Sequence, residues 1–95
     1  MAYSYARISK RTDPATPFWD FSKEDLERVK ALYDDTGRRL SFAVTISEDG
    51  LEETRAHVWE TIEDWQEYTA VFFDQWAVRD AYYAENNITS HRVEY

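Results

Sequence analysis

The sequence predicts an α+β domain with the order strand, helix, strand, strand, helix, strand. Two segments have the apolar spacing of helices, and each follows a capping residue. Between them, two alternating segments flank an Asp-Gly pair, as in a β-hairpin. The 95 residues suffice for one hydrophobic core, so we expect a single domain over residues 1–95.

The first predicted strand covers residues 3–10. Its side chains alternate, with Tyr5 and Arg7 on one side and Ile8 on the other. Residues 11–21 contain both prolines and lack a helical period, which predicts a loop whose aromatic side chains are tucked under other elements.

The first helix is predicted to begin after Ser22, an N-cap candidate with Asp25 three residues later. Phe21 and Leu26 have the spacing of a hydrophobic staple across this cap. Gly37 ends the helix, because glycine adopts the positive φ of a helix C-terminus at little cost.

The central hairpin is predicted from strands at 39–47 and 51–60, joined through Asp49 and Gly50. A second, long helix is predicted to begin after Thr61 and to end near Asn86 and Asn87, and residues 88–95 form the last strand. The apolar arc of this helix is broader than one sheet face requires, which suggests a pocket or a second subunit beneath it.

This order predicts a ferredoxin-like βαββαβ fold, with two helices on one face of a four-stranded antiparallel sheet. We expect the helices to cover an apolar sheet face of Ile8, Leu40, Phe42, Val44, Ile46, Ala56 and Val58. The opposite, uncovered face would then display Tyr3, Tyr5, Arg7, Ala43, Thr45, Arg55, His57 and Trp59.

Composition excludes several classes of function. The net charge is −8, and residues 48–85 carry eleven acidic residues against Arg55 and Arg79, which opposes binding to nucleic acid or to anionic membranes. There are no cysteines, no phosphate-binding glycine loop and no metal-ligand spacing around His57 or His91, so we expect no cofactor and no metal. No apolar run is long enough to span a bilayer, and residues 1–7 lack the apolar region of a secretory signal, so we expect a cytoplasmic protein.

The candidate site is the polar and aromatic side of the predicted sheet. In the ferredoxin-like order the first and third strands are neighbours, which places Tyr5 and Arg7 near Arg55, His57 and Trp59. Arginines among aromatic rings suit a small anionic or aromatic ligand, and the alternatives are a mixed polar and aromatic dimer interface or a solvated face. On an uncovered face, replacing His57 or Arg55 by Ala would leave the fold intact.

The passage Val-Trp-Glu-Thr-Ile-Glu-Asp-Trp-Gln-Glu-Tyr, residues 58–68, resembles the strand-to-helix passage of the dimeric α+β barrel superfamily. That superfamily includes antibiotic-biosynthesis monooxygenase-like and muconolactone-isomerase-like proteins. The resemblance implies a homodimer with two sheets packed face to face and a ligand-sized cavity between sheet and helices.

Three functions follow as hypotheses. The first is a non-catalytic homodimeric module that binds a small ligand or a protein partner. The second is a cofactor-free monooxygenase-like or isomerase-like enzyme that uses His57 with Tyr5, Arg55 or Trp59. The third is an acidic decoy that occupies a basic site on another protein. A preformed cavity with convergent polar groups favours the enzyme over the decoy.

Overall fold

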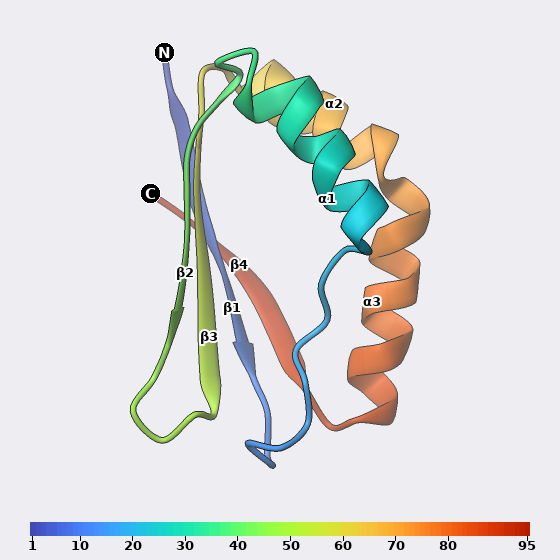
Figure 1. Cartoon of the computed structure of the whole chain (residues 1–95). Coiled ribbons are helices and arrows are strands. Elements are labelled where there is room, and N and C mark those ends of the chain that lie inside the picture. The colour runs from blue at the N-terminus through green and yellow to red at the C-terminus, as the bar shows by residue number, and fades with distance from the viewer.

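Four antiparallel strands form one sheet in the order β2-β3-β1-β4, in a computed structural model that describes all 95 residues. The strands are β1 (Tyr3–Lys10), β2 (Arg39–Ile46), β3 (Glu52–Trp59) and β4 (Thr89–Glu94). The helical elements are α1 (Lys23–Val29), its π-helical continuation η1 (Lys30–Asp34), α2 (Ile62–Val71) and α3 (Phe73–Glu85). All of the helices lie on one face of the sheet, which confirms the ferredoxin-like fold (Figure 1).

The predicted helix starts and turns are confirmed. The hydroxyl of Ser22 accepts a hydrogen bond from the backbone N–H of Asp25, and Thr61 caps α2 in the same way. Gly37 and Gly50 both have positive φ, at 76° and 75°, where the chain leaves η1 and where it turns between β2 and β3.

The second helical region is divided, whereas the sequence predicted one continuous helix. Phe72 separates α2 from α3 with non-helical backbone angles of φ −104° and ψ 23°. Its side chain is buried in the core. Across the break, the indole N–H of Trp76 donates to the backbone carbonyl of Thr69 at 2.9 Å. Two shorter helices can thus change direction over the twisted sheet (Figure 1).

The predicted assignment of the sheet faces is wrong, because the hairpin register differs by one residue. Phe42 pairs with His57 and Val44 pairs with Arg55, so the apolar side of β2 shares a face with the polar and aromatic side of β3. That shared face lies under the helices. Ile8, Ala56 and Val58, predicted for the core, lie on the opposite, uncovered face, and the predicted core residues Leu40, Phe42, Val44 and Ile46 are exposed on the edge strand.

The core is therefore built from aromatic rings. Trp59 and Tyr33 are its largest fully buried side chains, and their rings meet edge to face at 5.5 Å between centroids. Tyr5, Val29, Tyr68 and Phe72 complete the buried cluster. Large rings remove more area from water than Ala56 and Val58 do, which explains why the ring-bearing side faces inward.

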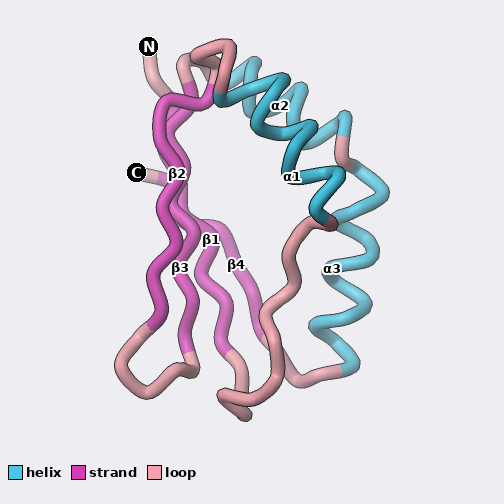
Figure 2. The backbone as a smooth tube through the Cα atoms, viewed as in Figure 1, coloured by secondary structure: helices cyan, strands magenta, loops and turns pink.

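The loop between β1 and α1 crosses the end of the space between sheet and helices (Figure 2). Hydrogen bonds fix this loop on both sides. Arg11 donates to the carbonyl of Gly50 at 2.7 Å, and Tyr82 of α3 donates to the carbonyl of Pro17 at 2.6 Å. These ties hold Trp19 and Phe21 against the helices.

Candidate functional site

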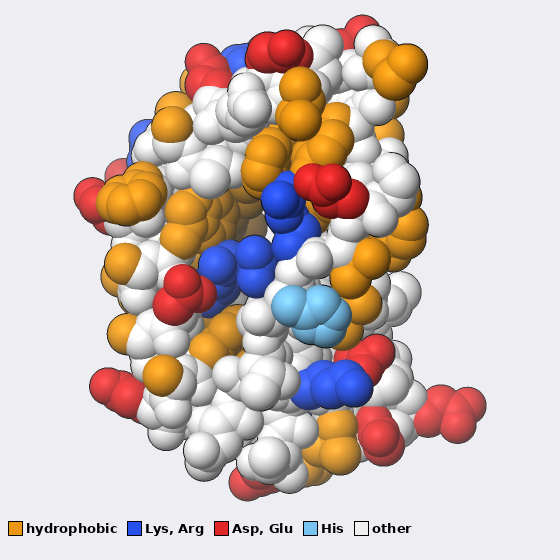
Figure 3. All heavy atoms as spheres, turned by 180° about the vertical axis from the view of Figure 1, so that it is seen from behind, with side chains coloured by type: hydrophobic (Ala, Val, Ile, Leu, Met, Phe, Trp, Pro, Cys, Tyr) orange, Lys and Arg blue, Asp and Glu red, His pale blue; other side chains and the backbone are white.

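A cavity of about 270 Å³ lies between the covered face of the sheet and the helices. Every strand and helix apart from η1 contributes to its lining, as does the loop between β1 and α1. Ten of its twenty lining residues are hydrophobic, and arginines supply most of the charge. From behind, cationic side chains gather at a hollow bordered by apolar ones (Figure 3). A concave apolar site with a few polar groups is the usual form of a small-molecule site.

Four of the five predicted site residues, Tyr5, Arg7, Arg55 and His57, line this cavity. Alternation along β1 and β3 places them on one face, and the pairs Tyr5–His57 and Arg7–Arg55 lie directly opposite each other. Trp59 does not line the cavity. It is 0% exposed and belongs to the core, where it packs between Tyr33 and Tyr68.

Five arginines line the cavity, and the sequence predicted only two of them. The three additions are Arg39 of β2, Arg79 of α3 and Arg92 of β4. The strand register explains why Arg39 and Arg92 line the cavity. Arg39 pairs with Trp59, and Arg92 pairs with Arg7, across neighbouring strands. Alternation in a single strand carries no information about such partners, and a helical Arg79 gives no strand signal at all.

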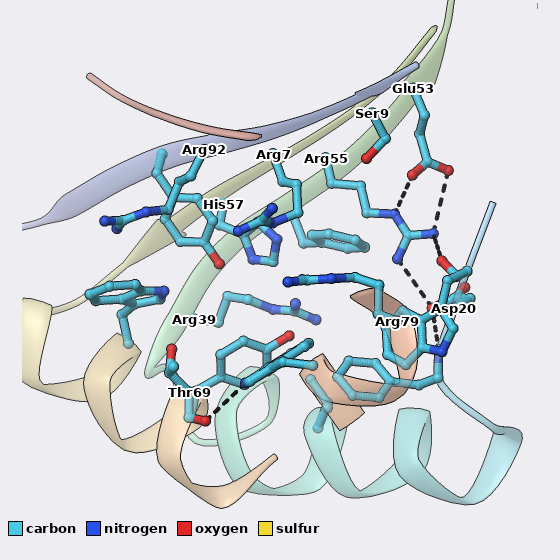
Figure 4. Close-up of a pocket in the computed structure, with 18 of the residues that line it drawn as sticks. Arg7, Ser9, Asp20, Arg39, Glu53, Arg55, His57, Thr69, Arg79 and Arg92 are labelled. Atoms are coloured by element: carbon cyan, nitrogen blue, oxygen red, sulfur yellow. Dashed lines mark hydrogen bonds and ion pairs between the residues drawn. The ribbon is translucent and has the colours of Figure 1, made fainter. Parts of the chain in front are cut away.

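Acidic side chains neutralise one end of the cavity. Arg55 donates to Glu53 at 2.7 Å and also contacts Asp20 at 3.3 Å (Figure 4). Burial lowers the pKa of Arg55, but hydrogen bonding to Glu53 and the charges of Glu53 and Asp20 outweigh it and raise the pKa. Because Asp20 lies in the loop before α1, this ion pair also fastens that loop to the sheet.

Arg7 has no such partner. Its guanidinium donates to the hydroxyl of Ser90 at 3.1 Å, and no carboxylate forms an ion pair with it. Burial lowers the pKa of Arg7, and the positive charge of Arg79 lowers it further. Arg7 extends from the sheet and Arg79 from α3, toward the middle of the cavity (Figure 4).

His57 is a neutral imidazole at physiological pH. Burial lowers its pKa from 6.5 to about 3, and the charges of Arg39, Arg55 and Arg7 act in the same direction. The ring stacks on Tyr5 with 4.6 Å between centroids. Its Nδ1 is buried and has no hydrogen-bond partner. Such an imidazole is a weak base for proton transfer near neutral pH.

Tyr5 also stays protonated, because burial raises the pKa of its phenol to about 12. No group of three or more His, Asp or Glu side chains is placed to hold a metal ion. None of the helices is long and apolar enough to cross a membrane. The chemistry that this lining offers is the recognition of anions and rings.

The fold and the cavity define a ferredoxin-like α+β protein with an arginine-rich and aromatic internal site. No protein-family model and no curated protein sequence matches the chain. A solved structure of a dimeric ferredoxin-like protein from an uncultured marine organism is similar, with a TM-score of 0.58 and 8% sequence identity. The match covers 99% of this chain and 94% of that chain, and at this identity it establishes the fold alone.

Proposed function

We propose that this protein is a homodimeric binding module that takes a small anionic or aromatic ligand into the cavity between its sheet and its helices. The observation that carries the proposal is the composition of the lining. In a chain of net charge −8, five arginines and only two carboxylates, Asp20 and Glu53, meet at one cavity. Concentrating cations inside an acidic protein costs desolvation free energy, which a bound anion would offset.

A second copy of the chain is the proposed cover of the open sheet face. Across that face Ala43, Ala56, Ala6 and Val93 are consecutive partners in neighbouring strands. A row of small side chains allows close approach of another sheet, at the spacing of about 10 Å of stacked sheets. The dimeric state of the similar marine protein and the resemblance to dimeric α+β barrels support this arrangement.

The alternative function is a cofactor-free enzyme of the monooxygenase or isomerase kind. The convergence of polar groups on a preformed cavity favours it over the acidic decoy, which would need a filled core. Binding is nevertheless preferred to catalysis. His57 has a pKa of about 3, whereas an efficient general base has a pKa near the working pH. No carboxylate is hydrogen-bonded to the imidazole to orient it.

Filling the cavity should weaken ligand binding. Thr69 of α2 lines the cavity, whereas its neighbour Ala70 is exposed. Thr69→Phe should therefore weaken ligand binding at least about tenfold, since the added ring occupies ligand volume. The matched variant Ala70→Phe should bind as the unaltered protein does. Calorimetric titration with small aromatic and carboxylate compounds measures both, and equal binding by the two variants would place the ligand elsewhere.

A charge in the row of small residues should separate the subunits. Light scattering after size exclusion should give twice the chain mass of 11.3 kDa for the unaltered protein. Ala56→Lys should give the single-chain mass, because an unpaired ammonium would be buried between two sheets. Val78→Lys on the exposed side of α3 is the control and should remain dimeric. A dimer that survives Ala56→Lys would show that another surface holds the subunits.

A further inference from the structure

Arg7 differs from the other four arginines of the cavity. Each of those has a carboxylate partner, namely Arg39 with Asp34 at 2.6 Å, Arg55 with Glu53 at 2.7 Å, Arg79 with Asp80 at 3.1 Å and Arg92 with Glu94 at 3.3 Å. Three of them also lie over rings, Arg39 over Phe42, Arg79 over Trp76 and Arg92 over Trp65. Arg7 has neither kind of partner. One positive charge in the cavity is therefore uncompensated.

The position of that charge indicates where an anion binds. Arg7 and Arg79 reach in from opposite walls, and the carboxylate of Asp80 that pairs with Arg79 is mostly exposed to solvent, which screens it. Two guanidinium groups that face each other in a partly buried space repel, and an anion between them converts the repulsion into two charge-assisted hydrogen bonds.

His57 supplies an independent observation at the same place. It lines the cavity, is 6% exposed, and leaves Nδ1 without a partner. Buried polar atoms are seldom left unpaired, since an unpaired buried donor or acceptor costs about 1–3 kcal/mol. Nδ1 is also shielded from water, so a ligand oxygen would pair with it only after a small shift of the imidazole ring.

The remaining lining selects the body of the ligand. Tyr5 and Phe42 on the sheet side and Trp65 and Tyr68 on the helix side present rings to the cavity. Rings favour offset or edge contacts with another planar ring. A volume of about 270 Å³ is close to the lower end of small-molecule pockets, roughly 300 Å³, which suits one or two fused rings.

We infer that the ligand is an aromatic monocarboxylate, with its carboxylate held between Arg7 and Arg79 beside His57 and its ring among the aromatic side chains. This inference rests on the proposed function of the cavity and names its ligand class. A single negative charge matches the single uncompensated arginine. A second charge on the ligand would find the other arginines already paired with Asp34, Glu53 or Glu94.

Matched acid and amide probes test the inference. The probes are benzoate with benzamide, 1-naphthoate with 1-naphthamide, and inorganic phosphate, titrated calorimetrically against the full chain up to about millimolar concentration. Within a pair, the acid should bind about 10- to 100-fold more tightly than the amide, as expected for loss of a charged hydrogen bond. Phosphate should bind more weakly than either acid, because it leaves the rings empty.

Three variants test whether Arg7 causes the difference between acid and amide affinity. Arg7→Gln should reduce the ratio of acid to amide affinity to near one, while the amide still binds. Arg28→Gln removes one positive charge outside the cavity and should keep the ratio. Circular dichroism checks folding. If Arg7→Gln is unfolded, Arg79→Gln carries the test, and it should lower the ratio by a smaller factor, because Arg7 still contacts the carboxylate.

The outcomes separate this inference from the proposed function. Equal binding of acid and amide by the unaltered protein overturns the carboxylate assignment and leaves a binding cavity. A ratio preserved in Arg7→Gln overturns the role of Arg7, and phosphate binding as tight as 1-naphthoate overturns the aromatic part. If no probe binds, the inference fails, and the comparison of Thr69→Phe with Ala70→Phe on other compounds decides the proposed function separately.

Discussion

Replacing Trp59 by Ala should lower the free energy of unfolding by about 3–5 kcal/mol. The indole is 0% exposed and packs against Tyr33, Tyr68 and His57, so its removal leaves a cavity in the centre of the core. Small domains have total stabilities of about 5–15 kcal/mol, and the loss is a large part of that. Urea denaturation followed by circular dichroism measures it.

Phe73→Ala is the matched control, because that ring is 69% exposed and its loss should change stability by less than about 0.5 kcal/mol. If Trp59→Ala is too unstable to fold, Trp59→Phe preserves part of the packing and should show a smaller, measurable loss. A cost below about 1 kcal/mol for Trp59→Ala would contradict the core position of Trp59.

Acidification from about pH 7.5 to about pH 5 should lower the free energy of unfolding by about 2 kcal/mol through His57 alone. The folded protein keeps His57 neutral down to a pKa of about 3, whereas in the unfolded chain the imidazole takes up a proton near 6.5. Between these values the unfolded state binds more protons. The stability that the neutral imidazole contributes is therefore complete above pH 6.5 and is lost as the pH falls toward 3.

Two histidine variants isolate this effect in denaturation curves taken at several pH values. In His57→Gln, the free energy of unfolding should no longer change with pH above about pH 5, where few carboxylates titrate. His91→Gln, at an exposed position of β4, should keep the pH dependence of the unaltered protein. Equal slopes in the unaltered protein and in His57→Gln would mean that His57 protonates in the folded state and is not buried as described.

The same two residues show where sequence reasoning about the site succeeded and where it failed. Alternation placed Arg55, His57 and Trp59 together on one side of β3, and they do lie on one side. It could not tell that this side is covered. His57 is therefore a buried residue of the cavity wall, and Trp59 is part of the core, although both were expected on an open surface.

The sequence by itself determined the order of the elements, the helix starts at Ser22 and Thr61, and the turns at Gly37 and Gly50. Each of these depends on groups a few residues apart: a hydroxyl that meets a nearby backbone N–H, or a glycine that accepts positive φ. All the groups that produce such a signal lie within a few residues of one another in the sequence. They needed no knowledge of the rest of the chain.

Only the tertiary structure decided which face of the sheet lies under the helices, where the long helix breaks, and that Arg39, Arg79 and Arg92 join Arg7 and Arg55. These outcomes depend on the pairing of strands that are distant in sequence, and a slip of one residue exchanges the two faces of a strand. Both faces of this sheet carry apolar side chains. The burial of the larger aromatic rings, summed over the whole chain, fixed the choice between them.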